Sequence, residues 1–218
     1  HLFYRGEMNE ALFKNAIAVV GSRLATSYGK SVVNNMVASF VRNKITVVSG
    51  FMYGIDTEAH KTAIEFGGKT IAVLGSGVNI CYPPENENLY TLIIETGGLV
   101  LSEYGPSTKP QLWTFPRRNR IVAALSNRGV LVVEAGIGSG SLITAKLGKK
   151  LGRRIYAVPG NINSKMSAGC NLLIKDDDAQ MVLKSEDFGL LDNKKYSDKA
   201  LPVMTVLESK IYRTLEHE

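Results

Sequence analysis

The stretch Ile17-Ala18-Val19-Val20-Gly21-Ser22-Arg23 decides the fold of this chain. Its four apolar residues suit a β-strand buried on both faces, and Gly21 lets the backbone turn sharply after them. A helix is expected from Tyr28 to about Val41, with Ser27 as its N-cap. A strand, a small polar loop and a helix N-terminus favour an anion, and Arg23 adds a positive charge there. The same residues also suit an ordinary turn in which Arg23 makes a surface salt bridge.

The alternation of strand and helix repeats along the chain. Further strands are expected over 45–50, 70–74, 99–103, 130–133 and 154–158, and further helices over 57–66, 85–96, 117–125 and 141–151. This order predicts an α/β protein, an extended Rossmann-like three-layer α/β/α domain with a mostly parallel sheet. Several of the strands end in glycine and serine, and the carboxyl ends of parallel strands form the ligand crevice in such folds.

Three segments are expected in the chain. Residues 1–15 form an entry segment and residues 16–188 form the Rossmann-like domain. Residues 189–218 form a linker and the start of a truncated C-terminal module, since 192–199 are polar and charged and 203–215 have helix-like apolar spacing. No apolar run approaches the length of a membrane span, and no signal-type segment opens the chain.

The charge balance permits an acidic partner without requiring one. The 218 residues include 26 Lys and Arg against 20 Asp and Glu, which gives a formal net charge of +6. A surplus of this size suits a polyanion such as nucleic acid, and it is also common on solvated surfaces. The two cysteines, Cys81 and Cys170, lie far apart without metal-ligand spacing. We interpret them as reduced thiols of a cytoplasmic protein.

Four loops rich in glycine and serine follow strands and offer unhindered backbone N–H groups that suit phosphates. They are 21–23, 49–50, 75–77 and 136–141. None matches a dinucleotide fingerprint or a nucleoside-triphosphate loop, so no cofactor is predicted. The alternative is that these glycines only make tight turns.

Phe115-Pro116-Arg117-Arg118-Asn119-Arg120-Ile121 places three arginines beside an aromatic ring, at the expected start of a helix that follows a long loop over 104–116. Guanidinium groups bind phosphate bidentately, and an aromatic ring stacks on an unpaired base. Cations at a helix N-terminus oppose its dipole, and a bound anion relieves that cost. The alternative is a solvated basic patch. Trp113 and Tyr53 are weaker stacking candidates.

The carboxylates give little support for catalysis. Glu134 before the last glycine-rich loop suits either a base acting on a sugar hydroxyl or an acceptor of backbone N–H bonds. Asp56 is the other carboxylate at a loop end. No Ser-His-Asp arrangement is recognisable, and His60 has no sequence partner, so neither nucleophilic catalysis nor a metal site is predicted.

The chain resembles the DNA-processing protein A (DprA/Smf) family over roughly residues 16 to 180. The phenylalanine-arginine motif 115–121 and the segments 132–135 and 138–145 carry the resemblance most strongly. The other matching segments are 19–23, 28–29, 48–50, 54–56, 59–60, 72–77, 82–83, 102–104, 158–160 and 169–174.

The resemblance implies a non-catalytic protein that binds single-stranded DNA. Such a protein protects incoming DNA in natural transformation, helps to load the RecA recombinase, and is typically a homodimer without a membrane partner. Many family members also have a small C-terminal winged-helix-like module, and 203–215 resembles its first helix. The motif residues and the glycine-rich loops together give the predicted DNA-binding residues. These are Gly21, Ser22, Arg23, Ser49, Gly50, Phe115, Arg117, Asn119, Arg120, Gly138, Ser139, Gly140 and Ser141.

Two alternative functions stay open at the level of the sequence. One is a nucleoside-monophosphate phosphoribohydrolase of the LOG type, of which Glu134 and its glycine-rich loop are a loose echo, although the PGGxGTxxE run of those enzymes is absent. The other is a nucleotide-sensing Rossmann domain. The three arginines of the 115–121 motif and the basic surplus suit an extended polyanion better than a mononucleotide.

Overall fold

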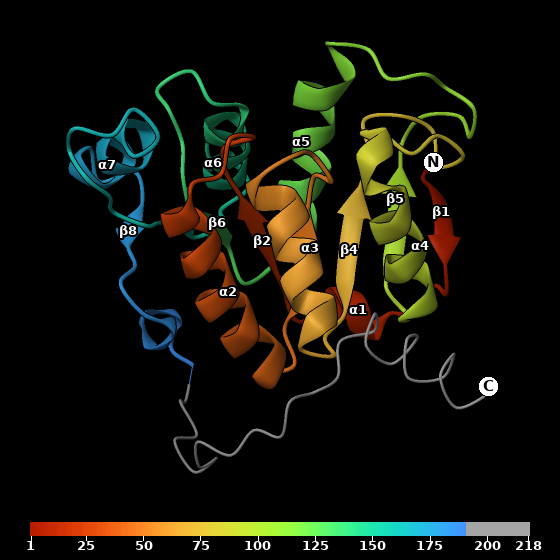
Figure 1. Cartoon of the computed structure of the whole chain (residues 1–218), viewed down its shortest axis with the longest axis horizontal. Helices are drawn as coiled ribbons and strands as arrows, with labels where there is room; N and C mark the ends of the chain where they lie inside the picture. The colour runs from red at the N-terminus through yellow and green to blue at the C-terminus, as the bar shows by residue number, and fades with distance from the viewer. Residues whose placement is uncertain (191–218) are drawn as a thin grey trace, which may run out of the picture.

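A single mixed sheet organises the computed structural model, which describes residues 1–190 (Figure 1). The strand order is β1-β5-β4-β3-β2-β6-β7-β8, and every neighbouring pair is parallel except β1 with β5. The strands are β1 (Phe3–Gly6), β2 (Ala16–Val20), β3 (Thr46–Ser49), β4 (Thr70–Val73), β5 (Leu99–Ser102), β6 (Val130–Val132), β7 (Ile155–Ala157) and β8 (Gln180–Met181). The expected linker and the helix over 203–215 lie outside the described residues.

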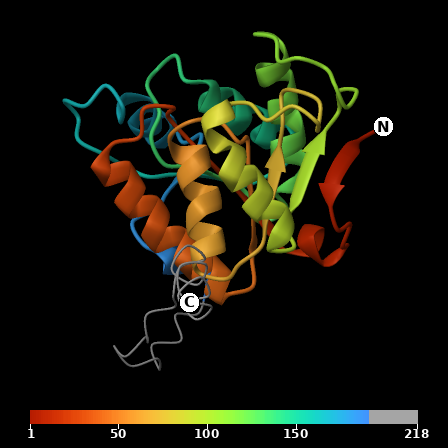
Figure 2. The ribbon, with the colours of Figure 1, turned by 45° about the vertical axis from the view of Figure 1, so that its right-hand side comes forward.

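Helices cover both faces of the sheet, which confirms the predicted three-layer α/β/α fold (Figure 2). On one face lie α2 (Ser27–Arg42), α3 (Ile55–Glu65) and α4 (Glu87–Glu95), together with the short helix η2 (Ser185–Phe188). The opposite face is covered by α1 (Ala11–Lys14), α5 (Thr114–Leu125), α6 (Gly140–Lys150) and α7 (Ala168–Lys175). A short helix η1 (Pro84–Asn86) precedes α4.

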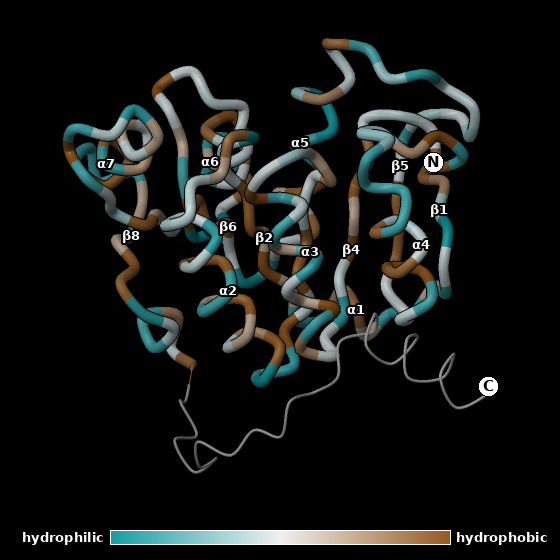
Figure 3. Tube along the Cα trace, in the orientation of Figure 1, coloured by the Kyte–Doolittle hydropathy of each residue, from teal (hydrophilic) through white to brown (hydrophobic). Residues whose placement is uncertain are grey.

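The central strands are apolar on both sides because helices press on both sides. All five residues of β2 are buried, and so are all the residues of β3, β4, β5, β6 and β7. The hydrophobic colour gathers along these strands in Figure 3. Continuous apolar runs of this kind are the signature of a parallel sheet, and this is why the sequence showed its strands clearly.

The connections reverse direction at β2, which pairs with β3 on one side and β6 on the other. From β2 the chain builds β3, β4 and β5 outward, then returns to β6 and builds β7 and β8 in the other direction. Ligands of open α/β sheets bind outside the carboxyl ends of the strands at such a switch point. The loops after β2 and β6 meet there.

Several local expectations need correction. Residues 1–15, expected as an entry segment, contribute a strand and a helix: β1 pairs antiparallel with β5, and α1 packs on the core through Leu12. As an exposed edge strand, β1 lacks the buried alternation that would have revealed it. Thr26, not Ser27, caps α2: its backbone is extended and its hydroxyl accepts the Gly29 N–H at 3.2 Å.

The strongly polar helix α5 begins three residues earlier than expected, at Thr114, so that Phe115 belongs to the helix rather than to the preceding loop. The expected helix 85–96 is divided into η1 and α4. The helix α7 and the two-residue strand β8 were not expected from the sequence. Both are short and partly exposed, and they leave little periodic pattern.

Candidate nucleic-acid interface

A cavity of about 540 Å³ opens at the carboxyl ends of β2, β3 and β6, at the switch point of the sheet. The arrowheads of β2 and β4 mark this edge of the sheet in Figure 1. Loops after the three strands form its floor, and the first half of α5 forms one wall. Its lining residues include Gly21, Ser22, Arg23, Leu24, Gly50, Met52, Asp56, Leu112, Phe115, Arg118, Asn119, Gly138, Ser139, Gly140, Ser141 and Met166.

The loop after β2 is held tightly, and this fixes the position of Arg23. A Cβ atom at Gly21 would come within 2.6 Å of Ile55 and within 2.9 Å of the Glu134 carbonyl oxygen, so only glycine fits there. The buried Ser22 hydroxyl accepts the Leu24 N–H at 3.0 Å. The turn therefore leaves the Arg23 side chain exposed at the cavity.

Phe115 meets Arg23 across the cavity. The Arg23 guanidinium carbon lies 5.7 Å from the centroid of the Phe115 ring, within the range of a cation–π contact. The Tyr82 ring lies 5.6 Å from the same ring, and a Cβ at Gly75 would come within 2.6 Å of it. Phe115 therefore packs against Tyr82 and Gly75 while its side chain remains partly exposed.

Arg118 is the buried cation of the site. Its Nη1 donates to the carbonyl oxygens of Gly50 and Val73, which joins α5 to the ends of β3 and β4. Burial lowers the pKa of Arg118 to about 10, with Asp56 opposing the shift and Arg23 adding to it. Burial also raises the pKa of Asp56, and Arg118 opposes that shift. Arg118 is therefore charged at neutral pH.

The same helix also positions the glycine-rich loop after β6. Asn119 accepts the Arg118 Nε–H at 3.2 Å and donates through Nδ2 to the Gly140 carbonyl at 3.2 Å. Ser139 caps α6 by accepting the Ser141 N–H. A Cβ at Gly138 or Gly140 would meet nothing within 4 Å, so these glycines leave the backbone open to a ligand.

Three predicted residues do not line the cavity. Arg117 and Arg120 lie on the outer side of α5, where both form ion pairs with Glu103. Arg117 also lies 6.0 Å from the Trp113 ring centroid. Ser49 is buried and donates its hydroxyl to the Val19 carbonyl at 2.6 Å, so its side chain ties β3 to β2.

Arg118 lines the cavity but was not among the DNA-binding residues predicted from the sequence, and helical spacing explains its position. With α5 starting at Thr114, Arg118 and Asn119 lie three and four residues after Phe115, and Val122 lies four and three residues after them, so the four share one helix face. An expected start at Arg117 hid this face. The loop 75–77 is also absent from the lining, and its Gly75 serves instead to admit the Phe115 ring.

The structure decides between the two roles considered for Glu134. Its carboxylate is buried and accepts the Thr26 N–H at 2.9 Å and the Thr26 hydroxyl at 2.5 Å. It does not line the cavity. Glu134 therefore fixes the start of α2, and it is not placed to act as a base on a bound nucleotide.

Within residues 1–190, no three side chains of His, Cys, Asp or Glu come together as a metal-binding group. In the same range, no helix is both long enough and apolar enough to cross a bilayer.

Fold and site together define a Rossmann-like α/β protein with a cationic, aromatic crevice at the switch point of its sheet. The family model of the DNA recombination-mediator protein A matches residues 1–190, and the chain belongs to this family. This confirms the resemblance found in the sequence.

Two curated relatives illustrate the match. The DNA processing protein DprA of Streptococcus pneumoniae is 44% identical over 186 residues, which cover 85% of this chain and 64% of the relative. Protein Smf of Escherichia coli is 39% identical over 201 residues, which cover 92% of this chain and 52% of the relative. The chain thus spans between half and two thirds of the length of these relatives.

Solved structures agree with the fold. The X-ray structure of DNA processing protein A from Streptococcus pneumoniae aligns with a TM-score of 0.79 at 44% identity, over 85% of this chain and 64% of that chain. A structure of DNA processing protein A from Helicobacter pylori, described as showing its single-stranded DNA binding mode, aligns with a TM-score of 0.75 at 29% identity. That alignment covers 86% of this chain and 84% of the other. A molybdenum cofactor binding protein from Rippkaea orientalis, at 18% identity and a TM-score of 0.55, shares the fold alone.

Proposed function

We propose that this protein binds single-stranded DNA in the switch-point crevice without catalysing a reaction on it. The observation that carries the proposal is the approach of the Arg23 guanidinium to the Phe115 ring, 5.7 Å from its centroid, beside the glycine-rich loop whose Gly138 and Gly140 are exposed. A guanidinium neutralises backbone phosphate, and a partly exposed ring stacks on a base of any identity. The single-stranded DNA binding described for the Helicobacter pylori relative supports the same assignment.

The predicted contacts divide into two kinds. Arg23, Gly50 and the loop 138–141 contact the sugar–phosphate chain, and Phe115 contacts a base. Arg117 and Arg120 reach the strand only by exchanging Glu103 for a phosphate, so we assign them a peripheral role. Duplex DNA keeps its bases stacked internally and gains nothing from Phe115, so the crevice favours single strands.

The cellular role is proposed from the family. We propose that the whole protein protects incoming single strands in natural transformation and helps to load the RecA recombinase on them. It acts in this role as a homodimer in the cytoplasm, without a membrane partner. Membership of the DNA recombination-mediator family supports this role.

The test is a competition between oligo(dT) and a duplex of equal length, read by the fluorescence of Trp113, the single tryptophan of the chain. Trp113 is 57% exposed and lies two residues before Phe115, so a strand in the crevice changes its surroundings. We expect oligo(dT) to displace the duplex. Equal binding of both forms would contradict the proposal, and release of free base from dTMP would favour a phosphoribohydrolase instead.

A further inference from the structure

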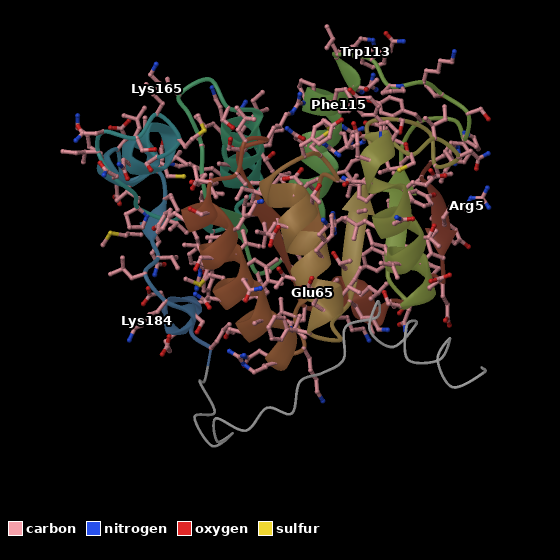
Figure 4. The ribbon with its side chains drawn as sticks, viewed as in Figure 1. Arg5, Glu65, Trp113, Phe115, Lys165 and Lys184 are labelled. Atoms are coloured by element: carbon pink, nitrogen blue, oxygen red, sulfur yellow. The ribbon has the colours of Figure 1, made fainter. Side chains whose placement is uncertain are left out.

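A second cavity lies at the opposite end of the sheet from the switch-point crevice. It has a volume of about 310 Å³ and lies where β2, β6 and β7 begin. Its wall includes Phe188 of η2, the short helix that follows Lys184. Figure 4 labels Lys184 at the lower left of the molecule and Phe115, which lines the first cavity, at the top. The two cavities are therefore separate sites.

Three arginines line this second cavity. Arg128 directly precedes the turn into β6, and Arg153 and Arg154 directly precede β7. The ion pairs found among residues 1–190 involve Glu103 and Asp178 and leave these three arginines out. Like charges around one cavity repel one another, and an anion bound in the cavity attracts each of them and so offsets the repulsion.

One of these guanidinium groups is already fixed in place. Arg153 donates through Nη2 to the Ala124 carbonyl oxygen at 2.8 Å. Its Nε is buried and has no hydrogen-bond partner among the described residues. Because this hydrogen bond already holds the guanidinium, little further side-chain freedom is lost when its remaining N–H groups bind an acceptor.

The rest of the cavity wall is largely apolar and aromatic. The Phe188 ring packs against Tyr156 and Phe40, with ring centroids 4.5 Å and 4.9 Å away. A cavity of this size is at the lower end of the range, roughly 300–1,000 Å³, that small-molecule sites occupy. Several guanidinium forks around one small cavity match the oxygens of a phosphoryl group better than a single carboxylate.

We propose that this second cavity binds a phosphoryl group, carried either by a free nucleotide or by a DNA backbone. The inference does not rest on the function proposed for the crevice. It concerns other residues, on the other end of the sheet, and its test has its own readout.

The test uses the full chain with the Arg23→Ala substitution, so that the crevice contributes less to binding. Binding of dTMP and of oligo(dT) is measured by calorimetry before and after adding Arg128→Ala and Arg154→Ala together. Arg42→Ala is the matched control: Arg42 is an exposed arginine of α2 that does not line the cavity. Unchanged melting temperatures show that each variant is folded, as expected from the exposure of Arg128 and Arg154.

We expect the paired substitution to weaken binding about tenfold or more, as loss of a hydrogen bond to a charged group does, while Arg42→Ala has little effect. Weaker binding of dTMP identifies a nucleotide site, and weaker binding of oligo(dT) alone identifies a DNA backbone contact. If neither ligand is affected, or Arg42→Ala acts equally, the inference is wrong. Failure of the crevice proposal would appear separately, as absence of oligo(dT) binding that responds to Arg23.

Discussion

The two sides of α5 differ sharply although they come from one seven-residue motif. Phe115 and Arg118 face the crevice, with Arg118 only 2% exposed and bonded to two strand ends. Arg117 and Arg120 face outward, with side chains 58% and 50% exposed, and both pair with Glu103. Adjacent arginines therefore have different functions, because the helical period and not the composition of the motif decides what each side chain meets.

The largest effect expected at neutral pH concerns the inner side of the helix. Arg118→Ala removes the group that donates to the buried carbonyl oxygens of Gly50 and Val73, and it removes the stronger of the two positive charges that act on Asp56. We expect the free energy of unfolding to fall by about 3 kcal/mol, as it does when one partner of a buried charge pair is removed. Denaturant titration measures this loss.

The outer side supplies the control for that experiment. Arg117→Ala changes an exposed ion pair whose N–O distance is 3.7 Å, so we expect the free energy of unfolding to change by less than about 0.5 kcal/mol. Equal losses in Arg118→Ala and Arg117→Ala would remove the distinction between the two sides of α5.

The buried His60, whose pKa Arg118 also lowers, should make the stability of this inner region depend on pH. Burial, with a contribution from Arg118, lowers the pKa of His60 from 6.5 to about 3. Between pH 6.5 and about 3, His60 therefore binds a proton in the unfolded chain but not in the folded chain. The contribution of neutral His60 to the free energy of unfolding is fully present above pH 6.5. It falls by about 1.4 kcal/mol for each pH unit as the pH decreases toward 3.

The variant His60→Gln tests this expectation, because glutamine does not titrate. We expect the variant to lose less stability than the wild-type protein between pH 6.5 and pH 4, as measured by denaturant titration at each pH. Parallel curves for both proteins would show that His60 is not the group responsible.

The next effect concerns DNA affinity. Phe115→Leu keeps an apolar side chain against Gly75 but removes the face on which a base stacks. We expect the affinity for oligo(dT) to fall by about 1–3 kcal/mol, the usual contribution of one stacked base. Fluorescence titration is the measurement, with Phe115→Tyr as the matched variant that retains stacking. A Leu variant that binds as tightly as the Tyr variant would exclude a stacking role.

The smallest effect is expected on the outer side of α5. Arg120→Ala removes a charge that Glu103 already neutralises, so the affinity for oligo(dT) should change by less than about 1 kcal/mol. Glu103→Gln should strengthen binding slightly, since it frees both arginines. If Arg120→Ala weakens binding as strongly as Phe115→Leu, the strand passes over the outer side of the helix.

The sequence predicted the central sheet because β2 to β7 are short runs buried on both faces, and their apolar residues are continuous. The edge strands β1 and β8 were not predicted, for the opposite reason. β1 is exposed along most of its length and β8 has only two residues, so neither leaves an apolar pattern. Only long-range pairing, such as that of Phe3 with Ser102, reveals them.

The candidate site was predictable to the extent that it follows strand ends. Gly21, Arg23 and Gly138 belong to loops that follow buried strands, and the topology brings these loops together. The burial of Arg118 and the outward direction of Arg120 depend on where α5 begins, which the run of prolines and polar residues before Thr114 obscures. Glu134 could not be assigned from sequence because its partner, Thr26, lies 108 residues away.

The most direct test of the central claim compares salt dependence in two variants of the crevice. Affinity for oligo(dT) is measured over a range of salt concentrations for Arg23→Ala and for Phe115→Leu. If Arg23 neutralises a phosphate, its loss makes the negative slope of log affinity against log salt shallower by about 0.7, whereas Phe115→Leu lowers affinity with the slope unchanged. Identical slopes for Arg23→Ala and the wild-type protein would contradict a role for Arg23 in holding the DNA backbone.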